Sequence, residues 1–327
     1  MKVLVTGGTG FLGQNLVSAL LRSNYQVVVY DNLSRADVNH KLDLDQVEYI
    51  VGDVRDKNKL EKSTKSVSTV VHLASINGTS NFYLNPRETF EVSALGTLNV
   101  IDSSIKNNVE NLIFSSSAEI YGDPTAIPTK ENSDFIVHQP YSLRYSYGGG
   151  KLAAELMIRY LAAGKIHRSI VFRPHNFYGP NMGQKHVIPE IYQKIINNTV
   201  NTAKDNLKES TIEIYGTGVE LRTFCYIDDI IQGIVLLLDS GVDQEVYNIG
   251  GNEPINIATL IELMASKLNT KVKIISLDNP PGSPKVRIPD ITKIKKLGYS
   301  PRVDLNEGIS KTIDWYSAIM RKNKFDQ

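Results

Sequence analysis

Short runs of β-branched and aliphatic residues alternate with longer amphipathic stretches through the first half of the chain. The apolar runs occupy residues 2–7, 26–31, 47–53, 69–75, 111–116 and 169–174. Helical periodicity covers residues 11–22 and a stretch around 94–107. Continuous apolar runs are typical of strands that are buried on both faces, and strands that alternate with helices form parallel sheets. The pattern predicts an α/β fold in which a doubly wound parallel sheet carries helices on both faces.

The alternation of apolar runs and amphipathic stretches changes after Pro180. We expect a helix over residues 189–197, an exposed polar loop over 198–210, a strand at 212–216, a helix at 226–240, a strand at 245–251, and amphipathic helices at 257–268 and 305–320. This order predicts a nucleotide-binding domain of residues 1–178 plus about 223–250. A smaller, discontinuous α/β domain of about 179–222 plus 251–327 would hold a substrate.

The first predicted strand ends in a glycine-rich turn. In "VTGGTGFLG", Gly7, Gly10 and Gly13 are spaced three residues apart, and Phe11 and Leu12 open the following helix. Glycines at these positions let the pyrophosphate of a dinucleotide approach the backbone at a helix N-terminus. The alternative is a tight strand-to-helix turn that binds nothing.

Acidic residues end the second and third predicted strands. Asp31 lies 18 residues after Gly13. A carboxylate at this offset bonds the adenosine ribose hydroxyls of NAD and repels the 2′-phosphate of NADP. We therefore predict NAD as the cofactor, although the nearby Arg35 weakens the preference. Asp53, at the end of the third strand, is expected to face the adenine or to cap a loop.

Residues 144–155, "RYSYGGGKLAAE", place Tyr147 four residues before Lys151. They do not form a phosphate loop, because Tyr145 stands where the first glycine is needed and Leu152 where Ser or Thr is needed. We predict a helix on which Tyr147 and Lys151 share one face. Its three interior glycines cost about 1 kcal/mol each relative to alanine. Close approach of a ligand or of a neighbouring helix would offset that cost.

Taken in order, the glycine loop, Asp31, "FSSSAEIYG" at 114–122 and the Tyr147 to Lys151 spacing resemble the extended short-chain dehydrogenase/reductase family. The nearest resemblance is to its nucleotide-sugar epimerases and dehydratases, and it runs from Met1 to about Tyr316. It implies a Rossmann-type domain whose bound NAD is reduced and reoxidised within one turnover. It also implies a homodimer and a nucleoside diphosphate sugar as substrate, with a UDP-sugar favoured.

The resemblance assigns roles residue by residue. Tyr147 would act as acid and base, Lys151 would grip the nicotinamide ribose, and Ser117 would relay protons through its hydroxyl. Further cofactor contacts are implied for Asn32, Val54, Leu73, Ala74 and Ser75. Substrate contacts are implied for Asn176, Arg222 and Arg287, with the arginines near the diphosphate. His175, beside Asn176, could also touch the substrate.

Tyrosine needs help to act as a base, since its free pKa is about 10. A nearby ammonium and the positive nicotinamide favour the phenolate, so we expect a lowered pKa for Tyr147. Tyr147 could then accept the proton of a sugar hydroxyl while hydride leaves the same carbon. This chemistry predicts oxidation at C4 to a 4-keto intermediate, and return of the hydride to the other face gives a C4 epimerase.

Glu119 lies two residues beyond Ser117 and would share its side of an extended strand. The 4,6-dehydratases that this region resembles carry Asp-Glu here, but Ala118 replaces the Asp. The decarboxylases that it resembles carry Thr-Ser-Glu, so chemistry at C5 stays open. Dehydration, decarboxylation of a uronic acid and C4 dehydrogenation therefore remain alternatives. A non-catalytic NAD-binding sensor or scaffold is the alternative from another class.

Composition and charge argue against several classes of binding partner. The chain has 36 Lys and Arg against 35 Asp and Glu, and a net charge of +1 leaves no general electrostatic footprint for nucleic acid or anionic membrane. Its N-terminus has no long apolar segment suited to a signal peptide. No cluster has metal-ligand spacing, and the single Cys225 fits a reducing compartment. We expect a cytoplasmic protein without a metal, a nucleic-acid partner or a membrane anchor.

Overall fold

The computed structural model describes residues 1–35, 47–136, 141–184, 186–201, 208–279 and 284–325. Its centre is a parallel sheet of order β12-β6-β5-β4-β1-β2-β3. The strands are β1 (Lys2–Thr6), β2 (Gln26–Asp31), β3 (Val47–Val51), β4 (Thr69–His72), β5 (Asn111–Ser115), β6 (Arg168–Pro174) and β12 (Val246–Ile249). The strand order reverses between β1 and β4, which opens a crevice at the carboxyl edge of the sheet.

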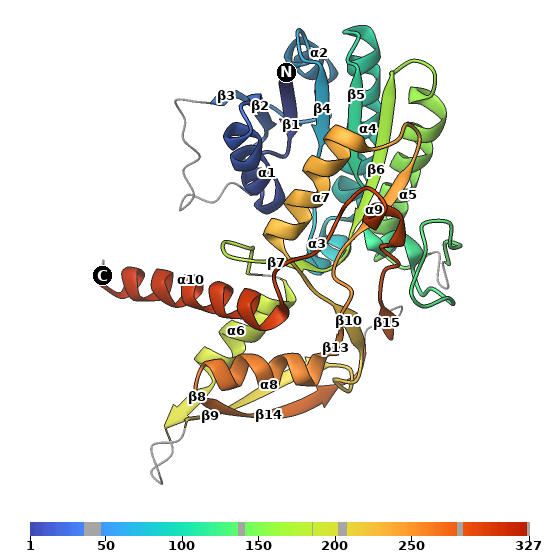
Figure 1. Ribbon diagram of the computed structural model, residues 1–327. Coiled ribbons are helices and arrows are strands. Elements are labelled where there is room, and N and C mark those ends of the chain that lie inside the picture. The colour runs from blue at the N-terminus through green and yellow to red at the C-terminus, as the bar shows by residue number, and fades with distance from the viewer. Residues whose placement is uncertain (36–46, 137–140, 185, 202–207, 280–283, 326–327) are drawn as a thin grey trace.

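Helices cover both faces of this sheet (Figure 1). One face carries α1 (Phe11–Arg22) and α7 (Ile227–Ser240), and the other carries α2 (Lys57–Ser63), α4 (Pro86–Lys106), α5 (Tyr145–Met157) and the π-helical turn η3 (Ile158–Ala162). Val3 and Val5 pack against the helices of the first face and Leu4 against those of the second, because successive side chains of a strand point to opposite faces. The predicted doubly wound α/β fold is confirmed.

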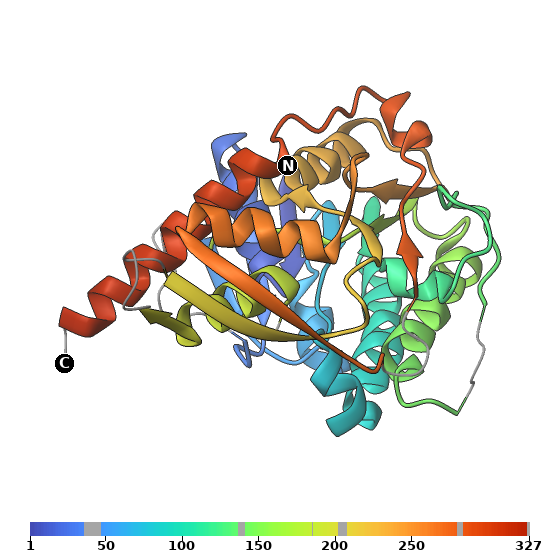
Figure 2. The same ribbon diagram turned by 90° about the horizontal axis from the view of Figure 1, so that it is seen from below.

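A smaller part lies below the carboxyl edge in Figure 1, and Figure 2 shows the molecule from the side of this part. It contains a sheet of order β14-β9-β8 and another of order β13-β10-β15, while β7 and β11 form a short parallel pair. The bounds are β7 (Phe177–Tyr178), β8 (Thr199–Asn201), β9 (Lys208–Tyr215), β10 (Leu221–Thr223), β11 (Cys225–Tyr226), β13 (Pro254–Asn256), β14 (Thr270–Leu277) and β15 (Val286–Arg287). The remaining elements are α3 (Thr79–Leu84), the 3-10 helix η2 (Ala118–Tyr121), α6 (Val187–Asn197), α8 (Ile257–Lys267), α9 (Thr292–Lys295) and α10 (Leu305–Phe325).

Some boundaries differ from the sequence expectation. The loop predicted over 198–210 is wrong in part, because β8 pairs antiparallel with the start of β9 and places Thr199 opposite Ser210. The pairing satisfies backbone groups although the side chains are polar; residues 202–207 lie outside the described part. The helix predicted around 94–107 begins earlier, at Pro86, a residue favoured at the first helical position. The division into two domains stays a prediction.

None of the helices in the described part of the chain is long and apolar enough to cross a membrane.

Candidate active site

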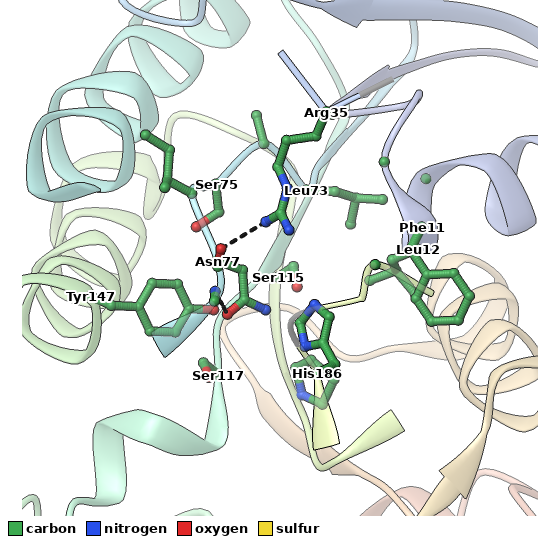
Figure 3. A pocket seen from close by; sticks show the side chains of 18 of the residues that line it. Phe11, Leu12, Arg35, Leu73, Ser75, Asn77, Ser115, Ser117, Tyr147 and His186 are labelled. Atoms are coloured by element: carbon green, nitrogen blue, oxygen red, sulfur yellow. Dashed lines mark hydrogen bonds between the residues drawn. The ribbon is translucent and has the colours of Figure 1, made fainter. Parts of the chain in front are cut away.

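A cavity of about 1330 Å³ opens at the carboxyl edge, where β1, β2, β3, β4 and β5 end. Helix α5 and the start of α6 complete its walls (Figure 3). Two of the predicted site residues, His175 and Arg222, do not line it. The others that line it are Gly7, Gly10, Phe11, Leu12, Gly13, Asp31, Asn32, Asp53, Val54, Leu73, Ala74, Ser75, Ser117, Glu119, Tyr147, Lys151, Asn176 and Arg287.

The glycine loop leaves room for a ligand at the N-terminus of α1. Gly7 has a φ of 72°, and a Cβ there would lie 2.7 Å from the Ala74 nitrogen. Gly10 caps α1 without a side-chain hydrogen bond, and a Cβ on it would meet only the Gly7 carbonyl oxygen, at 3.4 Å. The loop therefore leaves room for the close backbone approach that the pyrophosphate of NAD needs.

The two acidic residues are fixed by local hydrogen bonds. The carboxylate of Asp31 accepts from the Thr9 nitrogen at 3.0 Å and from the Leu33 nitrogen at 2.8 Å. Arg55 donates to both oxygens of Asp53, at 2.9 and 2.7 Å, and this pairing lowers the pKa of Asp53. Asp53 also accepts from the Arg55 backbone nitrogen at 2.8 Å, so it caps its own turn while it lines the cavity.

Tyr147 points into the cavity with Ser75 and Ser117 on either side (Figure 3). Its ring stacks on Phe82 with 4.7 Å between centroids, and the side chain is 5% exposed. Burial raises the pKa of Tyr147 to about 12, although hydrogen bonding to the Ser117 and Ser75 hydroxyls acts in the opposite direction. The protein groups by themselves therefore do not lower the pKa of Tyr147, contrary to the expectation from the sequence.

Lys151 lies one turn after Tyr147 on α5, as predicted. It is 1% exposed, and its Nζ donates to the Ser115 carbonyl oxygen at 2.7 Å. Burial lowers the pKa of Lys151 to about 7. The amine is therefore anchored to the end of β5, and desolvation works against the ammonium that was expected to favour the phenolate.

The three glycines of α5 meet three different surroundings. A Cβ on Gly148 would lie 3.1 Å from the Glu119 carbonyl oxygen, and one on Gly150 would lie 2.9 Å from the Ser93 Cβ on α4. A Cβ on Gly149 would meet nothing within 4 Å. Close approach of a neighbouring helix therefore explains Gly150, and contact with the turn after β5 explains Gly148.

The turn after β5 corrects the expectation for Glu119. Residues 118–121 form η2 rather than an extended strand, because Ser117 caps this turn by accepting from the Glu119 nitrogen at 3.2 Å. Glu119 still lines the cavity, where it accepts from Arg287 at 2.8 Å and from Arg144 at 3.1 Å. Burial opposes ionisation, but the two arginines outweigh it and lower the pKa of Glu119 to about 2.

The predicted substrate contacts separate into two groups. Asn176 lines the cavity with a φ of 29° and donates to the Thr223 carbonyl oxygen at 3.1 Å. Arg222 donates to the carbonyl oxygens of Leu221, Pro284 and Lys285 at 2.8, 2.7 and 3.1 Å and lies outside the lining. His175 is 1% exposed and hydrogen-bonds Asn248 at 3.1 Å, behind the cavity rather than in it.

Three residues at or near the cavity carry no predicted site role, although Arg35 was expected to weaken the preference for NAD. Arg144 pairs with Glu119, and Arg35 reaches across the opening to the Asn77 carbonyl oxygen at 2.7 Å (Figure 3). The pKa of His186 is lowered to about 4, mainly by burial and further by the positive charge of Arg35. The position of Arg144 one turn before Tyr147 was a usable signal, whereas Arg35 and His186 come together only through folding.

Known proteins resemble this chain along most of its length. The profile of the NAD dependent epimerase/dehydratase family matches residues 3–250. UDP-glucuronic acid decarboxylase 1 of Danio rerio is 31% identical over 97% of this chain and 72% of its own length. A putative UDP-glucose 4-epimerase of Methanocaldococcus jannaschii is 30% identical over 96% of this chain and 97% of its own length.

The crystal structure of UDP-glucose 4-epimerase with UDP-glucose from Thermotoga maritima is similar as well. Its TM-score is 0.86 at 26% identity, and the match covers 98% of this chain and 100% of that one. The predicted family and its cofactor NAD are confirmed. The chain therefore belongs to the NAD-dependent epimerase/dehydratase family.

Proposed function

We propose that this protein oxidises a nucleoside diphosphate sugar at C4 and returns the hydride to the opposite face of the 4-keto intermediate, as a C4 epimerase. The observation that carries the proposal is the placement of Tyr147, whose phenol points into the cavity that the glycine loop also lines and lies near the Ser117 hydroxyl. A phenol placed in this way can take and return the proton of one sugar hydroxyl.

The cofactor and three residues have separate roles in the proposed reaction. NAD, when bound, supplies the hydride acceptor and a positive nicotinamide that favours the phenolate. Tyr147 takes the C4 hydroxyl proton and later gives it back, and Ser117 orients that proton by hydrogen bonding. Lys151, anchored on the Ser115 carbonyl oxygen, is placed to donate a second hydrogen bond to the cofactor ribose.

The part of the cavity near Asn176 and Arg287 suits a nucleoside diphosphate. A uridine diphosphate is favoured because the related proteins are named for UDP-sugars. Arg287 lines the cavity, and its Nη2 is buried without a hydrogen-bond partner among the described residues. Arginine N–H groups form strong, charge-assisted hydrogen bonds to phosphate oxygens. We propose Asn176, Arg222 and Arg287 as the substrate ligands, with Arg222 turning from backbone carbonyls to the diphosphate.

Decarboxylation of a uronic acid is the second candidate. It is favoured by Glu119 beside Arg287, because a guanidinium binds a carboxylate as readily as a phosphate, and by the decarboxylase relative. Loss of carbon dioxide from a 4-keto uronic acid uses the same C4 oxidation. Dehydration is less well supported, since Ala118 has no acidic group and the ionised Glu119 has no proton to give.

Turnover of UDP-glucose and UDP-glucuronic acid in deuterium oxide tests these reactions, with NMR of the products. Epimerisation gives the C4 epimer with its C5 hydrogen retained, whereas decarboxylation gives a pentose with deuterium at C5. Deuterium at C5 or C6 that disappears in Glu119→Gln would overturn the epimerase proposal. Accumulated NADH would indicate a C4 dehydrogenase, and no hydride exchange with either sugar nucleotide would favour a non-catalytic sensor. Tyr147→Phe is the control that should stop every one of these reactions.

We further propose two domains, of residues 1–178 with about 223–250 and of about 179–222 with 251–327, in a cytoplasmic homodimer. The dimer is proposed to form through α4 and α5. Exposed apolar side chains on these helices support that surface: Phe90 is 45% exposed, Leu95 43% and Leu156 46%. Sedimentation velocity measures the oligomeric state, and a dimer that persists in Leu156→Glu would place the interface elsewhere.

A further inference from the structure

Arg144 has no role in the reaction proposed above, yet it makes two contacts with a cavity residue. It lies at the N-terminal end of α5, and its Nη2 is 3.3 Å from Oε1 and 3.1 Å from Oε2 of Glu119. Arg287 reaches Oε1 of the same carboxylate from β15, at 2.8 Å. The side chains of Arg144 and Arg287 are 13% exposed and that of Glu119 is 21% exposed.

Two guanidiniums on one carboxylate leave a net positive charge in a partly buried cluster. Arg287 also has the buried, unpartnered Nη2 and lines the cavity, so it is the member that can turn to an anion of the substrate. Glu119 would then keep only Arg144. A partly buried carboxylate left without any cation takes up a proton more readily.

We propose that Arg144 is a positioning residue, which holds the Glu119 carboxylate in place and balances its charge when Arg287 moves to the substrate. This inference rests on the proposed function in one respect, since it takes Arg287 as a substrate ligand. Its consequence lies at Tyr147. The charge of Glu119 raises the pKa of Tyr147 and that of Arg287 lowers it, so a fixed Glu119 keeps the proton affinity of the phenol steady.

Other charged groups also face this cluster. Arg222 feels the charges of Glu119, Arg287 and Arg144, and Tyr83 raises the pKa of Arg144 together with Glu119. Burial acts most strongly on Arg144 and lowers its pKa, but these partners reverse the shift. Arg222 donates to three backbone carbonyl oxygens rather than to Glu119, and the proposed function turns it toward the diphosphate, so Arg144 is the cation left beside Glu119.

The test removes Arg287 by mutation, so it needs neither substrate nor turnover. Protein labelled with carbon-13 at the glutamate δ-carbon is followed by NMR from about pH 5 to about pH 8, above the ordinary glutamate pKa of about 4.3. The Glu119 signal is identified by its loss in Glu119→Gln. The variants are Arg287→Met, Arg144→Met and the double variant, with Arg287→Gln and Arg144→Gln as a second set in case methionine disturbs folding.

We expect the Glu119 signal to stay constant in Arg287→Met, because Arg144 alone keeps the carboxylate charged. In the double variant it should titrate within this range, since an unpaired buried carboxyl has a raised pKa. Titration in both variants, or in neither, would overturn the proposal. A positive charge kept at position 144, as Arg144→Lys in the Arg287→Met background, should suppress the titration that the double variant shows.

A failure of this test is distinct from a failure of the proposed function. The titration depends only on Arg144, Arg287 and Glu119, whereas the epimerase proposal depends on the products formed in deuterium oxide. A protein that turns over no sugar nucleotide could still pass the titration, and an active epimerase could still fail it.

Discussion

Lys151→Met should remove a pH dependence from the stability of this protein. Lys151 is 1% exposed, and burial lowers its pKa from 10.5 to about 7. Between these two values the unfolded chain binds a proton that the folded chain does not. The free energy of unfolding therefore rises with pH in this window, and the cost of burial is complete below it.

The size of the effect follows from the shift. One pKa unit corresponds to about 1.4 kcal/mol. Lys151 is half protonated near pH 7 in the folded protein, so the rise between pH 7 and pH 9 should be about 2 kcal/mol. Tyr147 acts oppositely, because its raised pKa of about 12 lowers stability only above about pH 10, where an unfolded tyrosine ionises. The window below pH 9 is therefore free of its effect.

Urea unfolding at pH 7 and pH 9, on protein freed of bound nucleotide, measures this difference. The gain between the two pH values should be present in the wild type and absent in Lys151→Met. Lys65→Met, which removes an exposed lysine, is the matched control and should keep the gain. An equal gain in the wild type and Lys151→Met would show that the burial of Lys151 does not govern its protonation, and the reasoning would fail.

Other outcomes follow from the site and from α5. Tyr147→Phe should fold and bind NAD normally but lower turnover at least about 100-fold, the usual scale for a lost general acid and base; near-normal kcat would exclude Tyr147 from the chemistry. Asp31→Ala should raise the Kd for NAD more than the Kd for NADP, measured by fluorescence titration, and an unchanged ratio would contradict its assignment to the ribose. Gly149→Ala should raise the free energy of unfolding by up to about 1 kcal/mol in the monomer, since its Cβ meets open space. Gly150→Ala should lower it, because its Cβ would press on Ser93, and the opposite order in urea unfolding would refute the packing argument.

The sequence predicted those features that depend on neighbours along the chain. The glycine loop, Asp31 and the strand ends were readable because a parallel sheet brings all its carboxyl ends to one edge. The spacing of Tyr147 and Lys151 was readable because a helix repeats every 3.6 residues. These local rules located the cavity and led to the family, which the comparisons confirmed.

Contacts between distant segments decided the rest, because no local pattern encodes them. The sequence placed Glu119 on a strand, but a serine cap turned residues 118–121 into a 3-10 turn, and Arg287, 168 residues away, came to bind it. The sequence expected a lowered pKa at Tyr147, but burial beneath Phe82 raised it. The amino-acid order by itself determined which groups meet at the carboxyl edge. Only the tertiary structure decided which charge pairs with which and how much water reaches them, since both depend on packing across the whole fold.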